Sequence, residues 1–277
     1  MSRTQSHGQT DAAITPGKAA RVHRAGTVRC AIIVIALLAL EFACRTGLIK
    51  HITMVPPSVM VLAAVDVLMN PTIRASILVT LEEVLLATAL SIVLGLACGF
   101  WLFAAPWARK LADPVLSAWY SVPIFVFYPV MIVLFGIGQQ PIIAIAVVFS
   151  VAAMILSTVA ALDRIPPALF KTARILQLSL PQRVAFVLLP AALPHLMVGL
   201  RLVVAYALIA TIAGEFILSS IGIGHEIAFS YDNFKTDTMY GLILIVILAA
   251  IFLNMALTLL VQRMGGRVST IKGATGG

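Results

Sequence analysis

The sequence is short of charged residues, and this scarcity excludes a large class of proteins. Only 11% of the 277 residues are Asp, Glu, Lys or Arg, whereas 61% are hydrophobic. A soluble domain of this size carries about a quarter charged residues, so the composition instead predicts an all-α, polytopic membrane protein. The formal net charge of +8 is not a nucleic-acid signal, because membrane proteins gather Lys and Arg on one side of the bilayer.

Motifs for catalysis and metal binding are also missing. Cys30, Cys44 and Cys98 lie in separate apolar segments without CxxC spacing, and are interpreted as packing residues. The chain has no HExxH zinc motif and no GxxxxGK[ST] phosphate-binding loop. His195 and His225 lack a second ligand three or four residues away. We therefore expect no catalytic residue, no metal site, no cofactor and no ATP hydrolysis by this chain itself.

What the sequence does contain is a series of long apolar segments. Six of them supply the roughly 20 apolar residues that a membrane span needs, at 30–49, 77–105, 115–135, 141–162, 195–218 and 238–262. The first is predicted to stay uncleaved, because no small-residue cleavage site follows it. The predicted domains are a basic tail (1–29), the first span with an outer linker (30–76), a core (77–263) and a second tail (264–277).

The distribution of positive charge predicts the orientation. An even number of spans puts both termini on the same side of the membrane. With the termini inside, 15 of the 19 Lys and Arg residues fall inside, and the four outside are Arg45, Lys50, Arg74 and Lys235. Because inner loops are rich in Lys and Arg, the sequence predicts that both termini and the loop 163–194 are cytoplasmic.

The loop 163–194 is too polar and too rich in proline to cross a membrane. Pro167 suits the first turn of a helix, so a helix is predicted to begin there. It is expected to stop near Gln177. Lys171 and Arg174 fall on the polar face of this helix. Its apolar face is formed by Leu169, Phe170, Ala173 and Leu176.

A second short helix is predicted in the same loop. Ser179 and Gln182 have the spacing of a capping box, and Pro181 suits the first turn. This helix is expected to end at Pro190, with Pro194 at the start of the next span. The two amphipathic helices leave an apolar stripe, which is covered either by a partner protein or by the chain's own bundle or lipid.

The end of this loop resembles the EAA loop of ABC importer permeases. The residues that carry the resemblance are Leu176, Ser179, Val187, Leu189 and Pro190, followed by Gly199-Leu200-Arg201-Leu202. The family pattern is roughly Glu-Ala-Ala, three residues, Gly, nine residues and Ile-x-Leu-Pro. Counting back from Pro190 places its Glu at Lys171 and its Gly at Gln177, so the sequence departs from the pattern at both positions.

Other segments extend the resemblance over about residues 41–263. They are Glu41 and Arg45 before Pro56-Pro57-Ser58, then Pro123, Pro129 and Phe135-Gly136-Ile137-Gly138, and finally Glu215, Gly222, Gly224, Phe234, Thr236 and Asp237. Together they are similar to the nitrate, sulfonate and taurine branch of these permeases. Glu82 and Glu83 stand where that branch usually has a basic residue, and Ala87 where it often has Gly.

The resemblance implies a type I ABC importer permease with six transmembrane helices, in a bacterial inner membrane. It implies a homodimeric pore, cytoplasmic ABC ATPase subunits on the loop, and an extracytoplasmic binding protein that delivers a small sulfonate-, taurine- or nitrate-like solute. Phe170 is expected to anchor the ATPase contact. The expected coupling residues are Leu169, Phe170, Lys171, Ala173, Leu176, Gln177, Ser179 and Pro190. Membrane lipid is the other expected partner, and nucleic acid is not.

Two acid-containing pairs and the third span are further candidates. Glu41 and Arg45 are one turn apart and are expected to form a structural pair. For Glu82 and Glu83, early in the second span, a solvated interface position is favoured over the outer mouth of the pore. The third span contains Pro123, Pro129, Gly136 and Gly138. These residues predict a bend that is either a gate element or a packing kink.

A stand-alone secondary transporter or channel is the alternative function. Secondary carriers commonly show inverted repeats and carboxylates at the membrane midplane. This sequence has no internal repeat, and the acids of its spans cluster near the span ends. A membrane protease with the EExxxR motif is disfavoured because the Arg would fall at Ala87.

Overall fold

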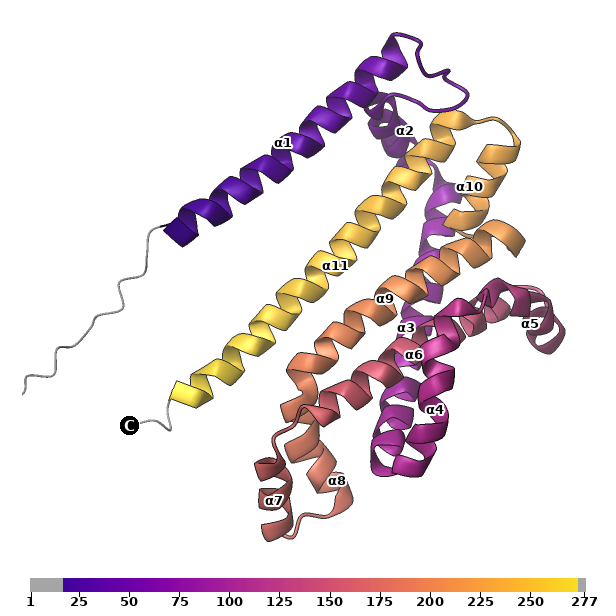
Figure 1. Ribbon diagram of the computed structural model, residues 1–277. Helices are drawn as coiled ribbons and strands as arrows, with labels where there is room; N and C mark the ends of the chain where they lie inside the picture. The colour runs from indigo at the N-terminus through magenta and orange to yellow at the C-terminus, as the bar shows by residue number, and fades with distance from the viewer. Residues whose placement is uncertain (1–16, 274–277) are drawn as a thin grey trace, which may run out of the picture. The chain divides into compact units, whose positions relative to one another are not determined.

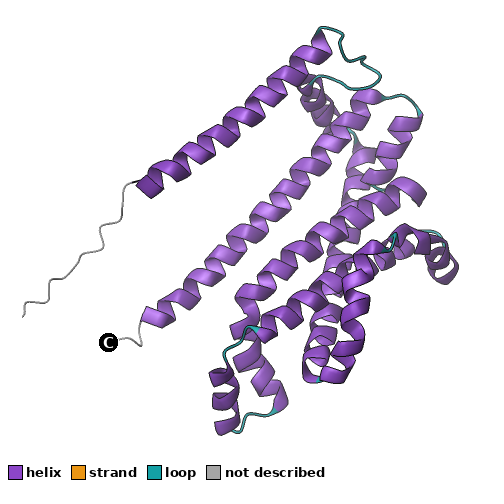
Figure 2. Cartoon of the chain, in the orientation of Figure 1, coloured by secondary structure: helices purple, strands orange, loops and turns teal. Residues whose placement is uncertain are grey.

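The computed structural model of the chain consists of helices joined by short turns (Figures 1 and 2). It describes the backbone of residues 17–273, together with the side chains of residue 28 and of residues 31–259 other than 124. No strand occurs within this described range, and the predicted all-α fold is confirmed. The chain divides into two compact units, Met1–Ser58 and Val59–Gly277.

The first unit contains helix α1 (Gly17–Arg45) and the start of α2 (Pro57–Met69). Arg45 Nε donates to Glu41 Oε1 at 2.6 Å, which confirms the predicted pair. Ser58 joins it: the Ser58 hydroxyl donates to Glu41 Oε1 at 2.7 Å and the Ser58 N–H donates to Glu41 Oε2 at 3.1 Å. Glu41 thereby satisfies an N–H that the first turn of α2 leaves free. Of the predicted basic tail, residues 1–16 lie outside the described residues.

Four helices of the described chain are long and apolar enough to cross a membrane. They are α3 (Pro71–Ala104), α6 (Gln139–Asp163), the helix Leu180–Leu218 that contains α9 (Leu189–Leu218), and the Thr236–Leu259 part of α11 (Thr236–Gly273). A fifth results if α4 (Pro106–Ala118) and α5 (Tyr128–Phe135) form one broken span. The predicted first span falls on α1, whose N-terminal side chains lie outside the described part.

Helix α6 is the central helix of the second unit. Its most apolar window is 56% buried, against 28% for α3, because α6 packs along both α3 and α9. Small residues allow this close approach: a Cβ on Gly95 would overlap Met154, and a Cβ on Gly199 would overlap Ser157. Small residues at helix contacts are the usual means of packing in lipid, where apolar tails provide no hydrophobic driving force.

The third span is sharply broken. After α4 the chain forms two short 3₁₀ helices, η1 (Trp119–Ser121) and η2 (Ile124–Phe127), and the two halves of the span meet at 91°. The break falls at Pro123, whose ring disfavours a helical conformation for the preceding residue. The rings of Tyr120, Phe149 and Tyr206 pack together with centroids 5.1–5.6 Å apart. This cluster attaches the broken segment to α6 and α9.

The fifth span begins earlier than the sequence predicts. Helix α8 (Leu180–Arg183), the π-helical turn η3 (Val184–Leu188) and α9 form one continuous helix, so the expected end at Pro190 is wrong. In the wider turn, the Leu189 N–H donates to the Val184 carbonyl. The hydrogen-bond ladder therefore shifts just before Pro190, which has no N–H to donate. The helix accommodates Pro190 and Pro194 in this way instead of ending there.

Candidate functional site

Helix α7 (Pro167–Ile175) forms the first half of the loop 163–194. Pro167 lies in its first turn, as predicted, where no intrahelical N–H bond is lost. The helix ends in a turn in which the Leu178 N–H donates to the Ala173 carbonyl at 3.2 Å. Gln177 takes a left-handed conformation there, with φ of 51°. Glycine commonly occupies this position, so the geometry explains why the family pattern has Gly at the position of Gln177.

The apolar face of α7 is divided between the interior and the exterior of the chain. Ala173 is fully buried. Phe170 stacks on Phe103 of α3, with ring centroids 6.1 Å apart. Leu169 and Leu176 remain exposed, by 37% and 63%. The Phe170 ring thus already packs on the chain's own bundle, and its expected role as the anchor for a partner stays a prediction.

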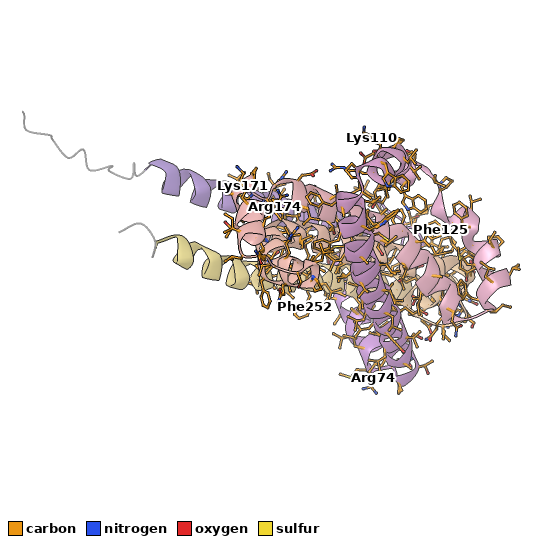
Figure 3. All side chains as sticks on the ribbon, turned by 90° about the horizontal axis from the view of Figure 1, so that it is seen from below. Arg74, Lys110, Phe125, Lys171, Arg174 and Phe252 are labelled. Atoms are coloured by element: carbon orange, nitrogen blue, oxygen red, sulfur yellow. The ribbon has the colours of Figure 1, made fainter. Side chains whose placement is uncertain are left out.

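The exterior of the loop carries both charge and large apolar side chains. Lys171 and Arg174 are exposed on α7, and Figure 3 shows both at the surface. Beyond the α7 apolar face, the most exposed large apolar side chains of the loop are Ile175 (80%), Leu180 (74%) and Phe186 (74%). These three lie from the end of α7 to η3, where the sequence analysis did not assign them a role.

The turn between α7 and α8 contains the other predicted coupling residues. The predicted capping box is present, and the Ser179 N–H donates to Gln182 Oε1 at 3.0 Å. Leu176, Gln177 and Ser179 are thus fixed in one short turn between two helices. Pro190 is part of the continuous helix that follows, beyond the π-helical turn.

An ion pair that the sequence analysis missed holds the start of the loop. Arg109 Nη1 and Nη2 donate to Asp163 Oδ1 and Oδ2 at 2.9 and 2.7 Å. Arg109 lies on α4 and Asp163 is the last residue of α6. Two parallel bonds between planar groups fix the orientation of both side chains. The pair joins the ends of two spans at the point where the loop begins.

The candidate gate residues have structural roles in the third span. Pro123 precedes η2 and Pro129 lies in the first turn of α5. Gly136 ends α5 with φ of 80°, and Gly138 precedes α6 with φ of 145°. Only glycine adopts such backbone conformations readily. The tight turn between α5 and α6 therefore explains the two glycines, and the break explains Pro123.

A buried polar junction joins α3, α9 and α10 (Ile223–Asp232). Glu215 of α9 is fully buried, and it accepts hydrogen bonds from Thr80 Oγ1 at 2.6 Å and from the Gly224 N–H at 2.7 Å. The Ile223 N–H donates to Thr80 Oγ1 at 2.8 Å. Thr80 and Glu215 thus satisfy N–H groups in the first turn of α10, which a helix N-terminus otherwise leaves free.

Two further contacts tighten this junction. Ser76 Oγ donates to Glu226 Oε1 at 3.0 Å, which connects α3 to α10. Gly222, with φ of 106°, packs directly on Glu215, and a Cβ there would overlap the carboxylate. The resemblance included Glu215, Gly222 and Gly224, but nothing in the sequence indicated that Thr80 completes the junction.

Glu82 and Glu83 have opposite environments. Glu82 is exposed, whereas Glu83 is fully buried, so the expected solvated position is wrong for Glu83. Successive residues of a helix are rotated by about 100°, so when one side chain faces outward its neighbour can face the bundle. A pair of adjacent acids therefore cannot be assigned one environment from the sequence.

The fold and these sites define a polytopic membrane protein of the transporter type. Its long apolar helices are broken at proline and glycine, its buried polar groups face the interior of the bundle, and two short helices form a structured loop between spans. The family described as binding-protein-dependent transport system inner membrane component matches residues 91–270. The chain belongs to this family and is a non-catalytic, multi-pass permease subunit of an ABC importer in the inner membrane.

Relatives and a solved structure agree with this assignment. The taurine transport system permease protein TauC of Escherichia coli (strain K12) is 26% identical over 196 residues, 71% of this chain and 71% of TauC. The nitrate import permease protein NrtB of Synechococcus elongatus is 27% identical over 195 residues, 70% of each chain. The MetNI methionine ABC transporter, inward facing, is 20% identical with a TM-score of 0.62, over 70% of this chain and 96% of that chain. The predicted type I permease fold is confirmed.

Proposed function

We propose that this chain forms half of the pore of an ATP-driven importer for a small sulfonate-, taurine- or nitrate-like solute. Two copies would pair by a twofold axis to close the pore. A binding protein would deliver the solute from outside, and separate ATPase subunits would dock on the loop 163–194. The names of the relatives TauC and NrtB support the class of solute.

The observation that supports ATPase docking is the exposed apolar surface of the loop. Leu176 and Leu180 lie at the turn between α7 and α8 and are 63% and 74% exposed, with Ile175 at 80% beside them. Other apolar groups of the loop, Phe170 and Ala173, face the bundle. Inward packing makes the loop rigid, and a rigid loop can transmit the movement of a docked subunit to α6 and α9.

Replacement of one exposed side chain tests the docking. Leu180→Asp is expected to weaken ATPase co-purification about a hundredfold, because it places a charge in an apolar contact. Ala168→Asp is the matched control, since it adds the same charge at an exposed position outside the coupling residues, in the first turn of α7, where Asp suits the helix N-terminus. Equal ATPase binding by both variants would show that the partner does not use this surface.

Reconstitution tests the solute class. Proteoliposomes that contain the permease, its ATPase and its binding protein should take up taurine only when ATP is present. The ATP must be on the side of the membrane that carries the ATPase subunits. Nitrate and glycine betaine serve as competing solutes. Uptake by the permease alone, driven by a proton or sodium gradient, would favour the secondary-transporter alternative instead.

A further inference from the structure

Two buried acids meet where α3 contacts α9. The carboxyl groups of Glu83 and Glu215 lie close enough to interact, and both side chains are fully buried. Glu215 is bonded to Thr80 and Gly224. In contrast, neither Glu83 oxygen has a hydrogen-bond partner of good geometry among the described residues. Glu83 is therefore a buried polar group that points toward a second acid and lacks a partner.

This arrangement is costly unless a cation is present. A buried polar group without a hydrogen bond is destabilising, and a buried charge without a counter-charge is more so. Two carboxylates at short range add mutual repulsion, and such pairs retain one proton between them. Among the described residues, no Lys or Arg side chain interacts with either carboxyl group. A bound proton would remove one of the two negative charges.

We propose that Glu83 and Glu215 form a proton-binding site. In this site the Glu83 carboxyl group is protonated and donates a hydrogen bond to the Glu215 carboxylate. Glu215 is the acceptor because Thr80 and the first turn of α10 already stabilise negative charge on it. Glu83 gains from this bond the one partner that it lacks. The shared proton then links α3 to α9 next to the junction with α10.

The packing suits a proton better than a metal ion. A Cβ on Gly222 would overlap the Glu215 carboxylate, and one on Gly224 would overlap the Ile212 carbonyl oxygen, so the carboxylate is tightly enclosed. The cavity that touches Thr80 has a volume of about 290 Å³ and is lined otherwise by apolar side chains. A metal ion needs several oxygen ligands, and the described residues contain no group of three His, Cys, Asp or Glu placed to hold one.

Any test must distinguish the effect of the pair from the effects of other titratable groups nearby. Those that interact with one of the two acids are Glu82 on α3, Tyr128 on α5 and His225 on α10. The packed elements carry further titratable side chains, and α6 carries only Asp163 at its far end. The others are Arg74 and Cys98 on α3, His195, Arg201 and Tyr206 on α9, Glu226, Tyr231 and Asp232 on α10, and Asp237, Tyr240, Arg263, Arg267 and Lys272 on α11. His225 is the one histidine among the groups that interact with the two acids, so it receives a variant of its own.

The proposed site predicts how the stability of the folded chain depends on pH. The folded chain holds one proton more than the unfolded chain near neutral pH, so its stability falls as pH rises. Loss of that proton places two charges in the apolar bundle and loosens the attachment of α10 to α3 and α9. The outer end of the second unit would then respond to alkaline conditions, independently of any ATPase.

The test compares the full-length permease in lipid nanodiscs with three variants. In infrared difference spectra at neutral pH, the unmodified protein should show a protonated carboxyl C=O band that is lost in Glu83→Gln. The melting temperature of the unmodified protein should fall between about pH 7 and about pH 9, and that fall should be smaller in Glu83→Gln. Gln is isosteric with Glu, and its NH₂ can donate to Glu215 without any bound proton.

Two controls isolate the pair. Glu82→Gln makes the same chemical change at the exposed neighbour, and His225→Gln removes the imidazole that interacts with Glu215. Both should keep the carboxyl band and the full fall in melting temperature. The proposal is overturned if Glu83→Gln keeps the band, if all variants show the same pH dependence, or if sodium ions at constant pH stabilise the unmodified protein but not Glu83→Gln. The infrared measurement on the unmodified protein does not depend on how any variant folds.

Discussion

At the scale of single residues, Gln177 takes a backbone conformation that its side chain disfavours. Its φ of 51° is left-handed, and a residue with a Cβ pays about 1–2 kcal/mol for that conformation. The turn nevertheless persists because the Leu178 N–H bonds back to the Ala173 carbonyl and because Ala173 is buried. A hydrogen bond within the turn and the burial of Ala173 therefore hold a conformation that the Gln side chain disfavours.

Replacing this residue should strengthen the loop. Gln177→Gly is expected to stabilise the turn by about 1 kcal/mol, because glycine adopts the left-handed conformation without the steric penalty. Slower protease cleavage within 163–194 would measure the effect. Lys171→Gly, at an exposed helical position of α7, should instead destabilise the helix by somewhat under about 1 kcal/mol. Faster cleavage of Gln177→Gly would contradict the argument.

At the scale of elements, the ends of α4 and α6 are fastened where the loop 163–194 begins. The Arg109–Asp163 pair has two hydrogen bonds of good length. Its side chains are 34% and 41% exposed, however, so solvent screening limits its contribution. Its main effect is geometric, since it fixes the direction in which the chain leaves α6 for α7.

A double-mutant cycle measures this pair. Arg109→Gln and Asp163→Asn should show a coupling energy of about 0.5–1 kcal/mol, which decreases in high salt. Lys110→Gln, the same kind of change at the exposed next residue, should show no coupling to Asp163→Asn. A coupling that is absent at low salt would mean that the two side chains do not form this pair in solution.

Between α8 and α9, the π-helical turn connects the loop to a membrane span without a break. Because Pro190 and Pro194 lie within one helix, a displacement of α8 would be transmitted along the axis of α9. Glu215 lies near the other end of α9 and holds the first turn of α10. One helix thus joins the loop to the buried junction.

At the scale of the whole molecule, much apolar surface remains uncovered by the chain itself. Only 6% of the apolar window of α11 and 28% of that of α3 are buried. Exposed apolar surface on this scale marks contact with lipid or with other chains. The second unit therefore presents apolar surface of the kind that lipid or other chains cover.

Site-directed labelling tests the proposed orientation. In a variant without the native cysteines, Ala168→Cys on α7 and Ser220→Cys between α9 and α10 both place a thiol at an exposed position. With cytoplasmic termini, an impermeant reagent applied to intact cells should label Ser220→Cys but not Ala168→Cys. Both should label after the membrane is permeabilised. The reverse pattern would show that the charge asymmetry misplaces the loop.

The sequence by itself determined the elements of this protein. Length and hydropathy are local properties, so four of the six predicted spans fall on long apolar helices of the described chain, and the third falls on the bent pair of α4 and α5. The capping box at Ser179 and the start of α7 at Pro167 followed from neighbouring residues alone. The break at Pro123 was also predictable, because proline acts on its own backbone and that of the residue before it.

Only the tertiary structure decided which side chains face one another. Phe170 stacks on Phe103, and Arg109 pairs with Asp163. The partners lie far apart in the sequence, so the periodicity of a helix cannot predict that they meet. The helix from Leu180 continues through two prolines because a π turn absorbs the lost hydrogen bond. Glu82 and Glu83 look equivalent in the sequence, yet helix rotation exposes one and buries the other beside Glu215. Burial depends on the packing of α3 against α9, which belongs to the assembled bundle and to no single segment.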